Sequence, residues 1–252
     1  MVGFGGLLFV FQFLFVLAAA TFQRSQAFEQ VAGLVPAFLR EAFGPSILPV
    51  LSYRGFVCLG YFHPFVIAAL IGMTIAVATE PAAEVERRFV DLALARPVTR
   101  GAVITRTAVL LLGSTSVLLG SMLFGTWLGL RVFTPSGAQP PSAALVAGLA
   151  INLAALMMCW GGLALALAAR ARRRAVTGTV TGGLAFTAYL VDYLARVWEP
   201  AARLAPLSPF HYYDPMRRLL GSPLEAAPIL TLAGAALVAG ALAYVVYERR
   251  DL

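Results

Sequence analysis

Runs of about twenty apolar residues recur along this chain, beginning with "MVGFGGLLFVFQFLFVLAAA". A helix needs about 20 mostly apolar residues to cross the hydrocarbon core of a bilayer. In lipid only helices and closed barrels satisfy their backbone polar groups, and barrel strands alternate in polarity, which these runs do not. The sequence therefore predicts an all-α, polytopic membrane bundle in a single domain, 1–252, with six transmembrane helices at 3–20, 57–79, 102–130, 142–169, 175–196 and 226–247.

The charge composition excludes some chemistry. The chain is 60% hydrophobic and only 12% charged, and all 19 of its basic residues are arginine. A P-loop requires a lysine that reaches the nucleotide phosphates, so we expect no ATP site of that kind and no cofactor bound by this chain. The net charge of +7 is explained by arginine-rich loops that set membrane topology, and it does not indicate a nucleic-acid partner.

The arginines also predict an orientation. Eleven of the 19 fall on one side of the six runs, in 80–106, in the short turn 170–174 and in the tail 249–250. The other eight are spread over longer loops, so both termini are expected in the cytoplasm. On the outer side, 28–44 has the spacing of an amphipathic interfacial helix. The proline-rich stretch 198–223 is expected to be broken, partly re-entrant backbone.

One charged block, "EVERRFVDLALARPVTRG" at 84–101, separates the second and third runs. Acids at its start suit a helix N-terminus, and Glu84 and Arg88 have the favourable i, i+4 order. Pro97 ends the predicted helix, and Thr99 can cap the third span. The block predicts a short surface helix with a rigid exit. It could be a solvated interfacial helix without a partner, but its dense charges of both signs and its proline–threonine junction favour a docking element.

The stretch "EVERRFVDLALARPVTRGAVITR" closely resembles the loop between the second and third spans in ATP-binding-cassette permeases of the type-2 exporter class. The pattern there is a glutamate, an apolar-acidic stretch, and "ARPVSR" or "SRPVSR" before a membrane helix. Here Glu84 matches the glutamate, Asp91 the acid, and 96–100 the terminal motif. "LVPAFLREAFG", "LSPFHYYDP" and the "RRDL" tail are also similar to segments of the family.

The resemblance implies a partnership and a set of coupling residues. Such permeases work in pairs, as a homodimer or with a related chain, in the bacterial inner membrane. Two separate ATPase subunits bind ATP and Mg²⁺, and the loop fits a groove on the ATPase. The residues carried over are Glu84, Arg88, Asp91 and Arg96 toward the ATPase, Phe89 and Leu92 toward the bundle, and Pro97 and Thr99 at the exit. Family members usually begin with a basic amphipathic helix, whereas the first run here starts at residue 3.

Few polar residues fall inside the predicted spans, and such residues are candidate functional sites. Asn152, Asp192 and Arg196 are therefore candidates for the substrate path or for helix contacts. The alternatives are an interhelical hydrogen bond for Asn152 and an interfacial ion pair for Asp192 with Arg196. Glycines four residues apart, at 125 and 129 and again at 178 and 182, predict close helix packing.

These observations predict a transport subunit and not an enzyme, because the sequence shows no nucleophile–base constellation and no metal-ligand spacing. We expect an exporter permease whose cargo is amphipathic or lipophilic (a drug, lipid, peptide or glycan), since the spans offer little fixed charge for recognising an ion. Two alternatives remain. One is an ion- or proton-coupled carrier that needs no ATPase, and the other is a membrane immunity or scaffold subunit that does not transport.

Overall fold

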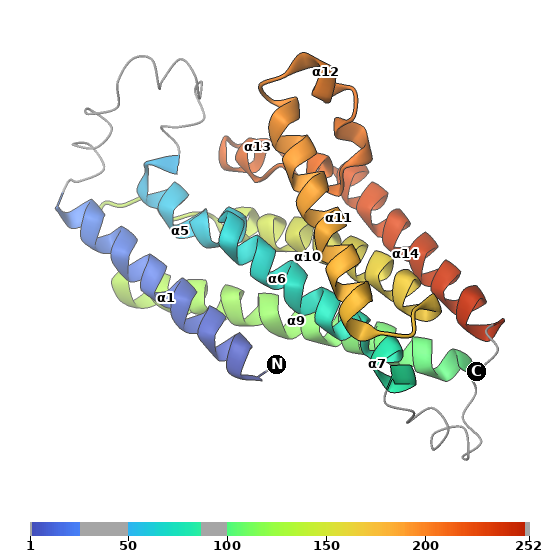
Figure 1. Ribbon diagram of the computed structural model, residues 1–252. Coiled ribbons are helices and arrows are strands. Elements are labelled where there is room, and N and C mark those ends of the chain that lie inside the picture. The colour runs from blue at the N-terminus through green and yellow to red at the C-terminus, as the bar shows by residue number, and fades with distance from the viewer. Residues whose placement is uncertain (1, 26–49, 87–99, 250–252) are drawn as a thin grey trace. The chain divides into compact units, whose positions relative to one another are not determined.

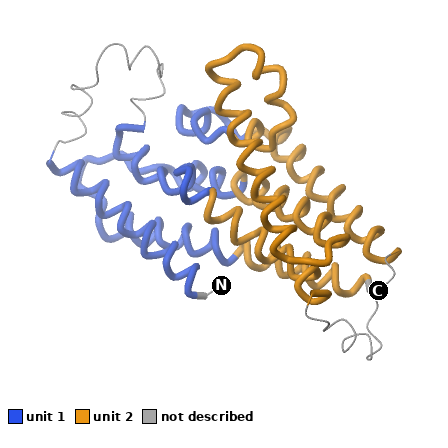
Figure 2. The backbone as a smooth tube through the Cα atoms, in the orientation of Figure 1, with its two compact units in different colours: residues 1–67, 117–151, 214–224 blue, residues 68–116, 152–213, 225–252 orange. Residues whose placement is uncertain are grey.

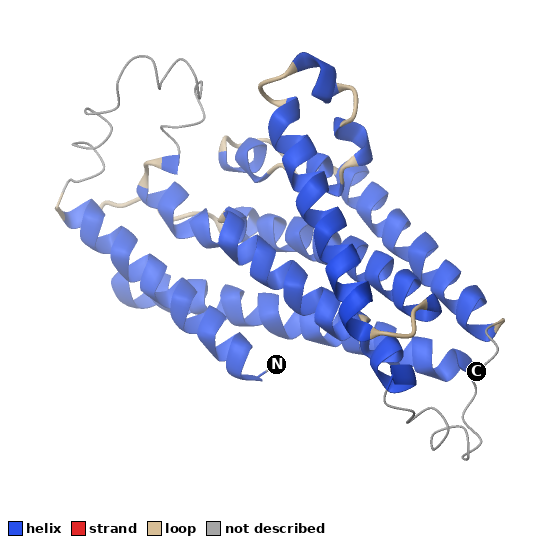
Figure 3. Ribbon diagram, in the orientation of Figure 1, coloured by secondary structure: helices blue, strands red, loops and turns tan. Residues whose placement is uncertain are grey.

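The computed structural model describes residues 2–25, 50–86 and 100–249, leaving out 1, 26–49, 87–99 and 250–252. Helices account for 85% of the described residues, and no strand occurs among them (Figure 3). This confirms the all-α prediction. The predicted outer helix at 28–44 lies outside the described residues, and so do positions 87–99 of the charged block.

Each predicted span coincides with a long helix or a pair of helices (Figure 1). In chain order these are α1 (Val2–Arg24), α5 (Tyr53–Phe62) with α6 (Pro64–Ala78), α9 (Arg100–Phe133), α10 (Ala143–Arg170), α11 (Arg174–Ala195) and α14 (Ala226–Glu248). Within the described residues, all of these except α11 are long and apolar enough to cross a membrane, which gives five candidate spans. α11 is long enough but more polar, because it carries four threonines and Asp192.

The second predicted span is one run of sequence but two helices. Proline disfavours helical backbone at the residue before it, and His63 accordingly adopts extended backbone at ψ 125° before Pro64. Pro64 then begins α6, where the missing N–H of a proline costs nothing. The span therefore runs from Tyr53 to Ala78 with a break at His63, a wider and less regular element than the predicted 57–79.

The described chain forms two compact units, and α6, α9 and α10 each contribute to both (Figure 2). The first unit contains α1, α5, the C-terminal half of α9 and the N-terminal part of α10. Its centre is a contact between α1 and α5, where the fully buried Gln12 donates a hydrogen bond from Nε2 to the carbonyl of Val57 at 2.8 Å. Gly60 lets this side chain approach α5 closely.

The second unit contains most of α6, the N-terminal part of α9, the rest of α10, and α11 and α14. Glycines on α10 allow its neighbours to come close. A Cβ at Gly161 would lie 2.9 Å from the Thr74 side chain, and one at Gly162 would lie 2.8 Å from the backbone oxygen of Ala236 on α14. The prediction of a single domain stays a prediction.

The proline-rich stretch forms short helical pieces separated by turns. They are α12 (Glu199–Ala202), η2 (Ala205–Leu207), η3 (Pro209–Tyr212) and α13 (Pro215–Leu219), each with a proline in its first two positions. In the second unit Ser208 donates a hydrogen bond to the carbonyl of Ala188 at 2.9 Å, which ties the stretch to α11. The backbone is broken here, as predicted.

Candidate functional site

The charged block begins with a short helix, α7 (Glu80–Glu86), that follows α6 almost without interruption. The sequence of α7 explains where the helix starts and which of its residues are buried. Glu80 lies in the first turn, where the helix dipole favours an anion, and Pro81 is tolerated there. Pro81, Ala82 and Ala83 are buried, while Glu84 and Glu86 are less covered. The helix therefore packs through small residues and keeps its carboxylates available.

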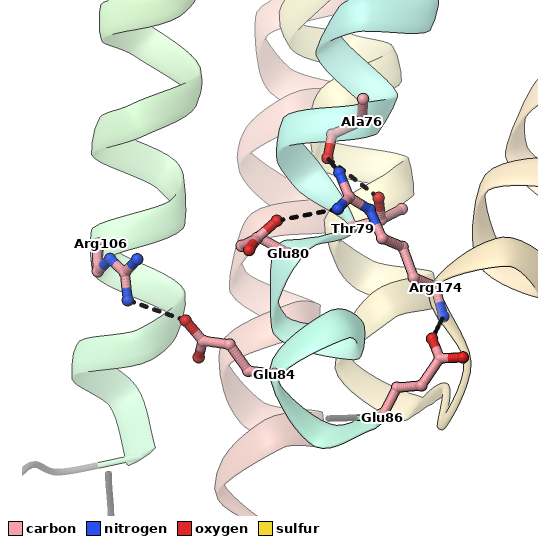
Figure 4. Close-up of polar contacts among 7 residues, drawn as sticks. All are labelled: Ala76, Thr79, Glu80, Glu84, Glu86, Arg106 and Arg174. Carbon is pink, nitrogen blue, oxygen red and sulfur yellow. Dashed lines mark hydrogen bonds and ion pairs between the residues drawn. The ribbon is translucent and has the colours of Figure 1, made fainter. Parts of the chain in front are cut away.

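Glu84 forms an ion pair with Arg106, the first of two arginines that hold α7 (Figure 4). Nη1 of Arg106 donates to Oε1 of Glu84 at 2.9 Å, and Arg106 belongs to the N-terminal part of α9. The arginine side chain is 63% exposed and the glutamate 20% exposed. Such an exposed pair contributes at most about 1 kcal/mol to stability, so its importance is in joining α7 to α9.

Arg174, at the start of α11, makes three contacts with α6 and α7 (Figure 4). Its Nη2 donates to the carbonyl of Ala76 at 2.8 Å, near the C-terminal end of α6, where carbonyls lack helical partners. Its Nη1 lies 3.4 Å from Oε2 of Glu80. Its backbone N–H donates to Oε2 of Glu86 at 2.9 Å, which places a carboxylate at the positive end of α11.

α7 is therefore bound to two helices that are far apart in sequence. Glu84 holds it to α9, and Glu80 and Glu86 hold it to α11. We call these two arginines and three glutamates the α7 ion-pair network. A displacement of α7 would pull on both helices at once, because charge-assisted hydrogen bonds resist separation more than neutral ones do.

The structure places only part of the predicted coupling set. Glu84 is described, and it pairs with Arg106 rather than standing free for a partner. Arg88, Phe89, Asp91, Leu92, Arg96, Pro97 and Thr99 lie outside the described residues. From sequence alone, Arg106 and Arg174 count only among the arginines that set topology. A signal was available in the sequence, because three acids at 80–86 attract basic partners and these two arginines lie near the cytoplasmic ends of predicted spans.

The other candidate residues do not join the α7 ion-pair network. Asp192 pairs with Arg196 at 2.9 Å near the C-terminal end of α11, and Nδ1 of His211 lies 4.0 Å from the same carboxylate. This is the ion pair anticipated from their spacing. Asn152 is buried, but its Oδ1 accepts no hydrogen bond from any described residue, so the predicted interhelical bond is not made through that atom. A role in a substrate path stays a prediction.

The two glycine pairs differ. A Cβ at Gly125 would lie 2.7 Å from the backbone oxygen of Phe9, and one at Gly129 would lie 2.8 Å from the Val16 side chain, so close packing is confirmed there. A Cβ at Gly178 or Gly182 would meet no atom within 4 Å, so the prediction of close packing at this pair was wrong. The α6 side includes the small residues Gly72 and Ala76, and a groove remains between the helices.

Among the described residues no group of three or more histidines, cysteines, aspartates or glutamates could hold a metal ion.

A family model described as ABC-2 family transporter protein matches residues 1–252, the full length given. The chain belongs to the ABC-2 transporter family. It is accordingly an ABC-2 type permease, a membrane transport subunit of a class that typically works with a separate ATPase subunit. Searches of curated proteins and of solved structures gave no match to this ABC-2 permease.

Proposed function

We propose that this ABC-2 permease forms the membrane path of an ATP-driven exporter, with two permease chains and two separate ATPase chains. ATP and Mg²⁺ bind on the ATPase partners, because this chain lacks the lysine of a P-loop. The cargo is amphipathic or lipophilic, of the drug, lipid, peptide or glycan class. This follows from spans with few fixed charges, which suit apolar contacts better than ion recognition.

The observation that carries this proposal is the α7 ion-pair network. α7 leads directly into residues 87–99, where the family motif lies, and it is bound to the starts of both α9 and α11. A push by an ATPase that moves α7 would therefore act on two long helices at once. Glu84 and Arg106 act in this transmission, and Arg88, Asp91 and Arg96 contact the ATPase.

The contacts of Arg174 also support the proposed orientation. The acids of α7 and the arginine turn at 170–174 must lie on the same side of the membrane, since Arg174 contacts Glu80 and Glu86. Dense arginine makes this the cytoplasmic side of a bacterial inner membrane. We propose that α11, although more polar than the five candidate spans, crosses as the sixth, which places both termini in the cytoplasm.

The test is to co-express this chain with candidate ATPases, purify through a tag on the permease, and measure ATP turnover in lipid nanodiscs. We expect a stoichiometric ATPase to co-purify. Glu84→Arg should lower the coupled ATP turnover about fivefold, the effect of losing one surface pair worth roughly 1 kcal/mol. The double variant Glu84→Arg with Arg106→Glu should restore it, since the pair is rebuilt with its charges exchanged.

Arg203→Glu is the matched control, because it reverses an exposed arginine in the stretch beyond α11 that takes no part in the network. If the exchanged pair fails to recover turnover while Glu84→Arg abolishes ATPase binding, Glu84 contacts the ATPase and does not act through Arg106. If no ATPase co-purifies and transport follows the proton gradient, the chain is a secondary carrier. A chain that binds a partner but moves no substrate would be an immunity or scaffold subunit.

A further inference from the structure

A groove of about 610 Å³ runs between α6 and α11 in the second unit, beside the α7 ion-pair network. Its walls are nearly all small or apolar and include Gly72, Ile75 and Ala76 on α6 and Ala175, Gly178 and Gly182 on α11. Arg174 and Glu86 close one end. Small residues on both helices leave this space, whereas a helix pair in contact would fill it with larger side chains.

The length of the groove decides which kind of apolar occupant fits. At 1.5 Å per helical residue, its walls extend about 10 Å along α6 from Gly72 to Thr79 and about 12 Å along α11 from Arg174 to Gly182. One leaflet contributes about 15 Å of the hydrocarbon core, half of its total thickness. The groove is thus long enough to cover most of one acyl chain within a leaflet, and too short to seat a helix that spans the bilayer.

The charge at the closed end decides the headgroup. Among the described acids, Glu80 and Glu86 lie at this end, and both are bound by Arg174, which also donates to the carbonyl of Ala76. The next arginines along the chain, at 170, 172 and 173, are exposed, and no described residue forms an ion pair with any of their side chains. An anion at this end would meet positive charge that no described acid neutralises, and arginine suits phosphate in particular.

We propose that this groove binds one acyl chain of an anionic phospholipid, with the lipid phosphate held by the exposed arginines of the 170–173 turn. The proposal rests on the proposed function only through the orientation, since anionic lipid is then supplied by the cytoplasmic leaflet. A zwitterionic lipid of the same chain length would fill the groove equally well but would gain less from the arginines. Binding should therefore discriminate between headgroups, and a side chain placed in the groove should abolish it.

Native mass spectrometry of the purified permease, alone or with its ATPase, measures this binding when dioleoyl phosphatidylglycerol or dioleoyl phosphatidylcholine is added. We expect one tightly held phosphatidylglycerol per chain and at least fivefold weaker binding of phosphatidylcholine. Gly178→Leu and Gly182→Leu should remove the tight site, and both accept a Cβ without meeting any atom within 4 Å. Arg172→Gln and Arg173→Gln should each weaken phosphatidylglycerol about fivefold, the typical effect of one arginine at an anionic surface.

Two matched controls keep the test specific. Gly183→Leu adds the same side chain in open space on the same helix at a position that does not line the groove, and Arg203→Gln removes an exposed arginine elsewhere. Equal binding of the two lipids, or equal binding by the Gly182 and Gly183 variants, would overturn the proposal. The proposal would also be overturned if Gly182→Leu changed the oligomeric state while lipid binding stayed intact. The groove would then seat a second copy of the chain.

The same preparations separate this proposal from the proposed function. ATPase co-purification is scored on each variant before lipid is added. If phosphatidylglycerol binds tightly but no ATPase co-purifies, the exporter proposal is overturned and the lipid-site proposal is retained. If a stoichiometric ATPase co-purifies but the permease does not prefer phosphatidylglycerol, the lipid-site proposal is overturned and the exporter proposal is retained.

Discussion

Two pairs of glycines with the same four-residue spacing have opposite surroundings in this ABC-2 permease. Gly125 and Gly129, in the first unit, are buried against α1. Gly178 and Gly182, in the second unit, border an open groove. The spacing places both glycines of a pair on one face of a helix. It does not determine what packs against that face.

The residues opposite each pair explain the difference. α1 presents the backbone of Phe9, the Cβ of Gln12 and the side chain of Val16, which recur at helical spacing and fill the hollows left by the glycines of α9. α6 instead presents Gly72 and Ala76 to α11, so both faces are small. In this permease the pair that faces larger side chains is closely packed, whereas the pair that faces Gly72 and Ala76 borders a groove. Close approach in membranes depends on this complementarity, since the hydrophobic effect does not draw two apolar helices together in lipid.

The largest expected effect comes from placing the same side chain at one glycine of each pair. Gly125→Leu would force a Cβ to within 2.7 Å of the backbone oxygen of Phe9, which cannot move away as a flexible side chain could. We expect a loss of about 3 kcal/mol or more, the upper range for overpacking. Gly178→Leu should stay within about 0.5 kcal/mol of the parent or gain slightly. Thermal unfolding in detergent, followed by size-exclusion chromatography, measures both.

If Gly125→Leu unfolds at the parent temperature, α1 does not pack on α9 as described. If Gly178→Leu falls by as much as Gly125→Leu, something fills the groove in the folded protein, and the contrast between the two pairs disappears.

How much could be predicted from the sequence follows from this contrast. The length and hydropathy of a segment can be read without knowing its neighbours, so the structure has helices where the six apolar runs predicted them. The break at His63 followed from Pro64, because a proline disfavours helical backbone at the residue before it. Which helices face each other depends on pairs of segments. The spacing of residues within one segment does not show which other helix packs against it. The glycines at 178 and 182 were therefore misjudged for this reason.

The candidate site follows the same division. Acids at the start of the charged block predicted a short helix that Pro97 ends, because capping and the dipole act locally. The structure describes its beginning as α7, and the rest of the predicted helix, at 87–97, lies outside the described residues. The partners of these acids, Arg106 and Arg174, are 22 residues or more away and were not assigned to them. Only the fold brings these arginines to α7. The choice of Arg88 as partner of Glu84 used the i, i+4 spacing along one helix, whereas the described structure pairs Glu84 with Arg106.

A second prediction tests whether the contact at Gly129 depends on the side chain that faces it. Gly129→Ala would bring a Cβ to 2.8 Å from the Cβ of Val16, and we expect a loss of about 1–2 kcal/mol. Val16→Ala in the same chain keeps the Cβ but removes the two methyl groups that would lie at 3.1 and 3.2 Å, so it should recover part of that loss. A double-mutant cycle on thermal stability gives the coupling, expected at about 0.5–1 kcal/mol. Additive effects would show that Gly129 and Val16 do not meet.

The smallest effect is expected at the open pair, where it has the opposite sign. Gly182→Ala places a methyl group where no atom lies within 4 Å, so nothing in the described structure opposes it. Alanine is preferred to glycine inside a helix, by up to about 1 kcal/mol in water. Gly183→Ala, also in open space but outside the groove, should gain as much. Thermal unfolding in phosphatidylcholine, which the groove should bind weakly, measures this intrinsic gain. Repeating it with phosphatidylglycerol should reduce the gain at Gly182 alone, because the added methyl then competes with a bound chain; equal gains in both lipids would mean that the groove holds no lipid.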